Sequence, residues 1–249
     1  MTAAPRPPQS CSDCTLRQQP GFVPMSGEEL ACVQAFRSGQ RALRAGQTVV
    51  PEHRAIDRLY TVFSGWAFPY KTLADGRRQI LNFLLPGDFV GLQGEFAQAA
   101  THGVEALTAL QLCVFLPQEL WGLYHAQPQL GYAITWLGAT QERLQDDILL
   151  SVGRRNAAER IAMLLIHLWR RAERVGLAAA DGSVPFPLTQ QHIADALGLS
   201  LVHTNKTLRR LERLGLHELR EGRLRLLHPE ALARIADYHM RPMRPVPLI

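Results

Sequence analysis

Between residues 42 and 117, the hydrophobic positions fall into short runs that are separated by glycines. Such runs occupy residues 48–50, 59–63 and 79–84. Asp75-Gly76 stands between two of them, and this dipeptide is typical of the two-residue turn in a β-hairpin. Regularly spaced short strands with glycine turns predict an antiparallel roll or barrel. Residues 1–20 are rich in proline and polar side chains, so we expect an irregular arm there.

The period of the pattern changes to that of a helix on either side of this region. Ser26, with Glu29 three residues later, has the spacing of a capping box and predicts a short helix to Phe36. After Pro128, a stripe with alternating steps of four and three predicts a long helix that pairs with a second copy as a coiled coil. An amphipathic helix lying on the chain's own core is the alternative. The stripe comprises Leu130, Ile134, Leu137, Gln141, Leu144, Ile148 and Ser151, and its polar Gln141 favours the dimer.

A further capped helix is predicted from Asn156, with Glu159 at its third position, to Gly176. Residues 189–213 then contain two short amphipathic helices, the first capped by Thr189 and the second by Ser200. Gly198 supplies the left-handed residue between them, so the segment predicts a helix-turn-helix. Leu201, Leu208 and Leu211 are expected to face the core, and the hairpin around Glu221-Gly222 is expected to form a basic wing.

Basic residues are concentrated in the same part of the chain. The 249 residues include 27 basic and 22 acidic side chains, a net charge of +5, and arginines crowd between residues 154 and 244. A helix that fits the major groove, surrounded by arginines that neutralise phosphates, predicts binding to double-stranded DNA. The alternative is a packed helical hairpin with a solvated basic face. The candidate DNA-binding residues are Thr189, Gln190, Ser200, Val202, His203, Asn205, Lys206, Arg209, Arg210 and Arg223.

The composition limits the other function classes. With 47% hydrophobic and 20% charged residues, the chain can bury a core. No window approaches the ~18 uninterrupted apolar residues of a membrane span, and the first ten residues lack the apolar centre of a secretion signal. We therefore expect a cytoplasmic protein that does not associate with membranes.

Three segments carry a resemblance to a known family. LPGDFVG at 85–91, DDILLSVGRRNAAERIA at 146–162 and TQQHIADALGLSLVHTNKTLRRL at 189–211 resemble the CRP/FNR superfamily of bacterial transcription regulators. The resemblance implies an α+β fold with an N-terminal antiparallel β-roll like a cyclic-nucleotide-binding domain, a long dimerisation helix and a C-terminal winged helix-turn-helix. It also implies a homodimer on a two-fold DNA site, with RNA polymerase as a partner and the roll reporting a signal.

On this reading, the chain divides into five parts: an arm at 1–20, the sensory roll at 21–122, the dimerisation helix at 123–153, the DNA-binding domain at 154–240 and a tail at 241–249. The recognition helix departs from the FNR branch of the family. Val202, Asn205 and Lys206 align with the glutamate, serine and arginine of that branch. Since Asn can bind adenine and Lys can bind guanine, the preferred half-site should differ from the usual FNR one.

Cyclic AMP is not expected as a ligand. Members of the family that bind it carry a glycine-glutamate pair followed by an arginine that faces the cyclic phosphate. Alignment on Pro86-Gly87-Asp88 places Leu92 at the glutamate position, and residues 93–108 contain no arginine or lysine. Burying a phosphate without a cation is costly. Gly94-Glu95 imitates the pair but is shifted along the chain.

The cysteines suggest a different signal. Cys11 and Cys14 form a CxxC motif, and with Cys113 they match three of the four iron–sulfur ligands that the FNR branch implies. Pro20 occupies the place of the fourth, for which Cys32 or a non-thiolate ligand such as Asp13 is a substitute. An iron–sulfur cluster, a zinc site or thiol switch, and no metal at all remain as alternatives.

An enzyme is not expected. The rival hypothesis is a CxxC oxidoreductase, which needs the motif at a helix start within a βαβ unit. Another rival is a metal-free regulator that binds a small molecule in the roll.

Overall fold

The computed structural model describes residues 8–92, 99–240 and 242–249. It contains two compact units. The first unit comprises the chain up to Lys71, residues 83–142 and residues 245–249. The second unit comprises residues 72–82 and 143–244. Each unit is described separately below.

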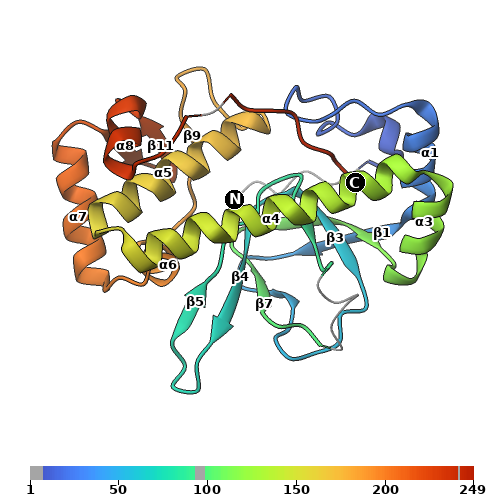
Figure 1. Ribbon diagram of the computed structural model, residues 1–249, viewed down its shortest axis with the longest axis horizontal. Helices are drawn as coiled ribbons and strands as arrows, with labels where there is room; N and C mark the ends of the chain where they lie inside the picture. Colours follow the sequence, from blue (N-terminus) through green and yellow to red (C-terminus); the bar gives the residue numbers. More distant parts are fainter. Residues whose placement is uncertain (1–7, 93–98, 241) are drawn as a thin grey trace. The chain divides into compact units, whose positions relative to one another are not determined.

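The first unit contains antiparallel strands in two sheets, so the predicted roll and the α+β fold class are confirmed (Figure 1). One sheet has the order β1-β8-β3-β6 and the other contains β2, β7 and β4 in that order. An apolar cluster that includes Leu43, Val62, Val104 and Leu112 fills the space between them. The strands are β1 (Arg37–Leu43), β2 (Thr48–Val50), β3 (Leu59–Ser64), β4 (Ala67–Thr72), β6 (Phe89–Val90), β7 (Gly103–Ala106) and β8 (Leu110–Phe115).

A tight turn follows β4 at the predicted Asp75-Gly76 position. Gly76 has a positive φ of 84°, and its N–H donates to the Leu73 oxygen (2.9 Å). The chain returns as β5 (Arg78–Ile80), which belongs to the second unit and contacts the first helix of the helix-turn-helix.

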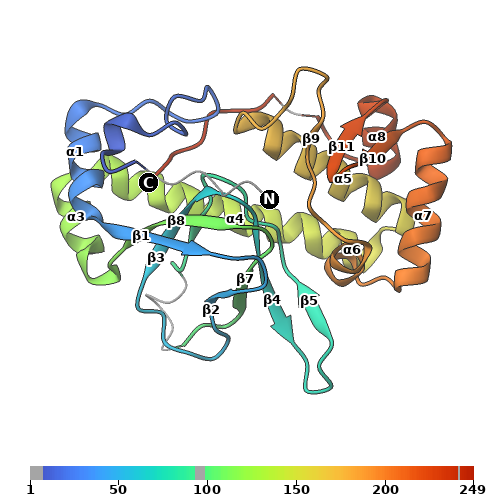
Figure 2. The same ribbon diagram turned by 180° about the vertical axis from the view of Figure 1, so that it is seen from behind.

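Helices cover the outer face of the β1-β8-β3-β6 sheet (Figure 2). They are η1 (Cys11–Asp13), α1 (Gly27–Phe36), α3 (Leu120–Ala126) and the start of α4 (Pro128–Arg154), and the short helix η2 (Pro117–Glu119) leads into α3. The Ser26–Glu29 capping box forms as predicted. A second apolar cluster joins these helices to the sheet through residues such as Phe36, Phe115, Leu123 and Ile134.

The second unit is built around α5 (Ala157–Arg174), whose side chains Ile161, Leu165 and Leu168 are fully buried. The predicted capping box between Asn156 and Glu159 begins this helix. Around it lie α6 (Gln190–Leu197), α7 (Leu201–Arg213), α8 (Pro229–Ala236) and a small sheet of order β10-β11-β9 (Figure 1). The strands of this sheet are β9 (Val184–Pro185), β10 (His217–Arg220) and β11 (Arg223–Leu226).

Helix α4 corrects the predicted dimer seam. The long helix is present, but Leu130, Ile134, Leu137 and Leu144 are buried within a single copy of the chain, and Gln141 and Ile148 are half-buried. The first three belong to the apolar cluster of the first unit. The four–three spacing therefore marks the face of the helix that packs on its own core, since the same spacing serves either purpose.

The units also depart from the predicted parts of the chain. Residues 245–249 belong to the first unit, although the chain immediately before them belongs to the second. The helix expected at 123–153 is two helices, α3 and α4, which meet at Gln127. Among the described residues, no helix combines the length and apolarity needed to cross a bilayer.

Candidate functional site

The helix-turn-helix forms from local caps on both of its helices. Thr189 Oγ1 accepts from the His192 N–H, and Ser200 Oγ accepts from the His203 N–H (both 3.2 Å). Gly198 adopts the left-handed conformation with φ of 62° and turns the chain between α6 and α7. Side chains from elsewhere in the second unit cap the last carbonyls of α6: Gln79 Nε2 donates to Ala196 O (3.0 Å) and Arg160 Nη1 to Leu197 O (2.8 Å). The turn is therefore held at both ends.

Helix α7 divides into a buried and an exposed face. Thr204, Thr207, Leu208 and Leu211 are buried against the unit. A shallow surface depression runs along the other side, lined by Val202, Asn205, Lys206, Arg209, Glu212 and Arg213. The predicted DNA-facing residues that are exposed are Thr189, Gln190, Ser200, Val202, His203, Lys206, Arg209 and Arg210.

Two positions on α7 correct the predictions. Leu201 was expected in the core, but it is exposed, because the buried stripe runs instead through Thr204 and Leu208. Asn205 was expected to face outward, but it is half-buried, and its Oδ1 is enclosed without a hydrogen-bond partner among the described residues. Its position beside Thr204 and three residues before Leu208 places it at the edge of the buried face.

The wing forms the predicted hairpin. Glu221 and Gly222 both have positive φ values, 51° and 71°, as a type I′ turn requires. A groove between the hairpin and the helix-turn-helix is lined by residues that include Gln190, Arg209, Arg220 and Arg223.

The arginines of the wing differ in what they contact. Arg220 pairs with Glu218 (2.6 Å), and Arg225 is exposed. Arg223 was expected to reach phosphate. Instead, its Nε donates to Ser183 Oγ (2.8 Å) and its Nη2 to Ser183 O (2.7 Å), beside β9. Its guanidinium is therefore used to hold the small sheet together.

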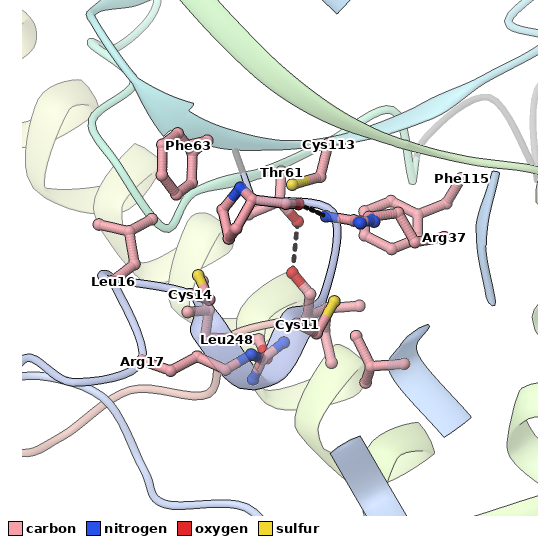
Figure 3. Close-up of a pocket in the computed structure, with 13 residues that line it drawn as sticks. Cys11, Cys14, Leu16, Arg17, Arg37, Thr61, Phe63, Cys113, Phe115 and Leu248 are labelled. Carbon is pink, nitrogen blue, oxygen red and sulfur yellow. Dashed lines mark hydrogen bonds between the residues drawn. The ribbon is translucent and has the colours of Figure 1, made fainter. Parts of the chain in front are cut away.

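A second candidate site lies in the first unit, where three cysteines line one pocket (Figure 3). Cys11 and Cys14 come from the arm, and Cys113 comes from the middle of β8. Cys113 pairs in register with Thr61 of β3, so the two side chains share a face of the sheet. Gln34 of α1 fixes the arm by accepting the Cys11 N–H (2.6 Å).

Two arginines also line this pocket, and all four cysteines are free thiols among the described residues. Arg37 holds the arm through the backbone oxygens of Pro8 (2.8 Å) and Gln9. Burial raises the pKa of the Cys113 thiol to about 11, although the guanidinium of Arg37 opposes the shift. Burial also raises the pKa of Cys11, against the guanidinium groups of Arg37 and Arg17. Burial therefore favours the protonated form of the Cys11 and Cys113 thiols at neutral pH.

Known proteins resemble this chain over nearly its whole length. A model for the cyclic nucleotide-binding domain matches residues 40–127, and one for the Crp-like helix-turn-helix domain matches residues 159–235. The nitrogen fixation regulation protein FixK of Bradyrhizobium diazoefficiens is 32% identical over 227 residues, which cover 91% of this chain and 93% of FixK. The chain belongs to the CRP/FNR family of transcription regulators.

Two other CRP/FNR proteins extend the comparison. The transcriptional activator protein FnrL of Cereibacter sphaeroides is 33% identical over 215 residues, 86% of this chain and 85% of FnrL. The solved structure of FixK2 from Bradyrhizobium japonicum matches with a TM-score of 0.72 at 26% identity, over 82% of this chain and 98% of that one. The present chain is thus a DNA-binding transcription regulator of the CRP/FNR type, with α6 and α7 as its helix-turn-helix.

The three-thiol pocket of this CRP/FNR regulator does not fit an iron–sulfur cluster. Such clusters take four cysteine ligands in the common case. Cys32 lies on α1, half-buried and outside the pocket, so the substitute fourth ligand is not brought to the site. The cavity measures about 20 Å³, which is room for about one water. Across residues 8–92, 99–240 and 242–249, no three His, Cys, Asp or Glu side chains are arranged to hold a metal ion.

The structure also bears on two other predictions. Cys11 lies in the short helix η1 of the arm, where it and Cys14 are buried, whereas an oxidoreductase needs an accessible CxxC at the start of an α-helix. Leu92 stands at the glutamate position of the cyclic-nucleotide binders. It packs against the second apolar cluster, the one that joins the helices to the β1-β8-β3-β6 sheet. Gly94-Glu95 lies outside the described residues.

Sequence reasoning missed several residues that line the pocket. Arg17 and Arg37 carry no motif, and Thr61 is one of many strand threonines. Leu248 and Ile249 also line it. The apolar side chains Val246, Leu248 and Ile249 could have indicated a buried tail, because side chains of this type are most often buried in folded proteins.

Proposed function

We propose that this regulator binds a two-fold DNA site as a homodimer, with α7 of each copy in the major groove. The observation that carries the proposal is the exposed face of α7, where Val202, His203 and Lys206 lie in the first half of the helix and Arg209 and Arg210 follow. The N-terminal half of a recognition helix contacts base edges, and arginines beyond it reach the backbone. RNA polymerase in the cytoplasm is the partner that transcription regulation requires.

The dimer would use the exposed face of α4, in place of the buried stripe. This face has the three–four spacing of a coiled-coil seam, and three of its seven positions carry apolar side chains. The seven positions are Tyr132, Thr135, Ala139, Glu142, Asp146, Leu149 and Gly153. Tyr132 and Leu149 are each 73% exposed, which is unusual for large apolar side chains on a helix. Burial against a second copy would remove both from water.

The signal would enter through the three-thiol pocket. Support comes from the convergence of Cys11, Cys14 and Cys113 on one face of the sheet, with two guanidinium groups beside them. The guanidinium groups of Arg17 and Arg37 oppose the rise in pKa that burial causes at Cys11, and Arg37 does the same at Cys113. Since the pocket as folded does not fit a cluster, the chemistry we propose is that of the thiols themselves. We do not expect cyclic AMP to bind.

The test of DNA recognition is the variant Lys206→Ala, measured by fluorescence anisotropy on a duplex selected from a random pool. We expect a loss of about 1–3 kcal/mol in binding free energy on the selected duplex and a relaxed base preference at one position. Lys71→Ala is the matched control, because Lys71 is an exposed lysine in the first unit. Equal losses on selected and scrambled duplexes would show that Lys206 contacts phosphate.

The test of the signal compares the DNA affinity of reduced protein with that of protein modified by N-ethylmaleimide, in which each thiolate sulfur adds to the carbon–carbon double bond. We expect modification at the pocket to change the affinity of the full chain and the effect to disappear in Cys113→Ala. An unchanged affinity after complete modification of the pocket thiols would contradict a thiol signal.

A further inference from the structure

Residues 245–249 are held against the arm by backbone hydrogen bonds. Val246 N–H donates to Gly21 O, and Val23 N–H donates to Val246 O (both 2.9 Å), which forms a short parallel bridge between Phe22 and Val246. Figure 2 shows this end of the chain beside the arm. The segment thus has a defined seat in the first unit, although residues 143–244 before it belong to the second.

The end of this segment closes the three-thiol pocket. Leu248 and Ile249 line it and are only 2% and 3% exposed. Two groups of the pocket hold their backbone: Arg17 Nη1 donates to Leu248 O (2.9 Å), and Thr61 Oγ1 donates to Ile249 O (2.7 Å; Figure 3). Thr61 is the direct neighbour of Cys113 across the sheet, so the segment is seated where that thiol lies.

The walls of the pocket differ in how readily they can move. The sheet wall is rigid, because β8 is paired along its length with β1 on one side and β3 on the other. The arm wall is tied to α1 and β1 through Gln34 and Arg37. Within the described part of the chain, the backbone of residues 245–249 is held by the bridge to the arm and the two bonds just described. Its backbone is therefore held by fewer hydrogen bonds than the sheet wall, and the burial of Val246, Leu248 and Ile249 supplies the rest of what keeps it docked.

We propose that residues 245–249 are a docking segment that competes with any group bound to the pocket thiols. A cavity of about 20 Å³ leaves no space for a thiol-bound group larger than a water, so such a group needs the volume of Leu248 and Ile249. Either the segment is docked and the thiols are shielded, or the thiols are loaded and the segment is released. By linkage, each event weakens the other by the same factor.

The proposal rests on the proposed signalling role of the thiols and adds the element that responds to them. Residues 245–249 follow directly on the chain of the second unit. When they leave the pocket, the end of that chain is no longer anchored to the first unit through them. A signal at the thiols would therefore reach the DNA-binding helices through the chain itself.

The first experiment measures thiol access in the full-length protein. The rate of modification by N-ethylmaleimide at each cysteine is followed by peptide mass spectrometry, with Cys32, which lies outside the pocket, as the internal reference. Leu248→Asp should raise the rate at Cys113 about tenfold or more, since tenfold corresponds to ~1.4 kcal/mol of lost docking. Met243→Asp, at an exposed position before the segment, is the matched control and should change nothing.

A milder variant protects this test against misfolding. Thr61→Val preserves side-chain shape but removes the donor to Ile249 O, and it should raise the rate at Cys113 by a smaller factor. Rates at the pocket thiols that stay constant relative to Cys32 in both variants would overturn the proposal.

The second experiment runs in the opposite direction. Hydrogen exchange of the Val246 amide, which donates to Gly21 O, is compared before and after N-ethylmaleimide modifies Cys113. Release predicts faster exchange after modification, and unchanged protection would overturn the proposal. DNA affinity is measured on the same samples. If thiol modification and Val246 exchange respond as expected while DNA affinity does not change, the docking segment is supported and the thiol signal is contradicted. If DNA affinity changes while thiol access and Val246 exchange do not, the docking segment alone is contradicted.

Discussion

Arg223→Ala and Arg225→Ala separate folding from DNA binding at two arginines on the same strand. Both side chains lie on one face of β11, two residues apart. Arg223 donates two hydrogen bonds to Ser183, whereas Arg225 is exposed at the surface of the wing. We expect the first substitution to destabilise the second unit and the second to weaken DNA binding.

The size of the stability effect follows from the two contacts. A hydrogen bond to a charged group contributes ~1.5–3 kcal/mol to stability. Because Arg223 is partly exposed, we expect each of its two bonds to contribute no more than the lower value of that range. Losing both should therefore cost about 2 kcal/mol of unfolding free energy. With a urea m-value of ~2 kcal/mol/M, the midpoint should fall by about 1 M. For Arg225→Ala, the change should stay within ~0.5 kcal/mol, as for other surface positions.

The assay pairs urea unfolding with DNA affinity at several salt concentrations. Each phosphate contact that is lost reduces the salt slope by ~0.9, so Arg225→Ala in both copies of a dimer should reduce it by ~1.8. Ser183→Ala should reproduce part of the Arg223→Ala destabilisation, because it removes one acceptor. If Arg223→Ala leaves the urea midpoint unchanged and lowers the salt slope instead, the hydrogen bonds to Ser183 contribute nothing to stability, and Arg223 binds phosphate.

Two further predictions concern the α4 seam and pH. Leu149→Ala should raise the dissociation constant of the dimer about tenfold in sedimentation experiments, with little change in the unfolding free energy. Leu137→Ala, at a side chain only 9% exposed, should instead cost ~2–5 kcal/mol of unfolding free energy. The opposite pattern would show that the buried stripe forms the seam. Burial lowers the pKa of His217, against the opposing charge of Glu212. Below the usual histidine pKa, the unfolded chain therefore binds a proton that the folded chain excludes, so the unfolding free energy should fall as the pH is lowered, by up to ~1.4 kcal/mol per pH unit for one proton. His217→Gln should flatten that part of the profile, and a profile that matches the wild-type protein would show that His217 does not carry the effect.

Local chemistry made much of the fold predictable from the sequence. The capping boxes at Ser26 and Asn156, the glycine turns at Gly76 and Gly198, and the turn at Glu221-Gly222 all form where the pattern placed them. These features depend on a few neighbouring residues, whose backbone preferences and side-chain bonds act over less than two helical turns. The order of the elements and the exposed basic face of α7 follow from them.

Tertiary structure alone decided which surface each side of a helix meets and which distant residues share a pocket. A four–three stripe is the same pattern for a helix on its own core and for a dimer seam, so only the packing of Leu130 and Ile134 settles the matter. The hydrogen bonds of Arg223 to Ser183, and of Arg17 and Thr61 to Leu248 and Ile249, join residues that are 40 to 231 positions apart. Such contacts depend on how the whole chain is folded, and no local preference encodes them.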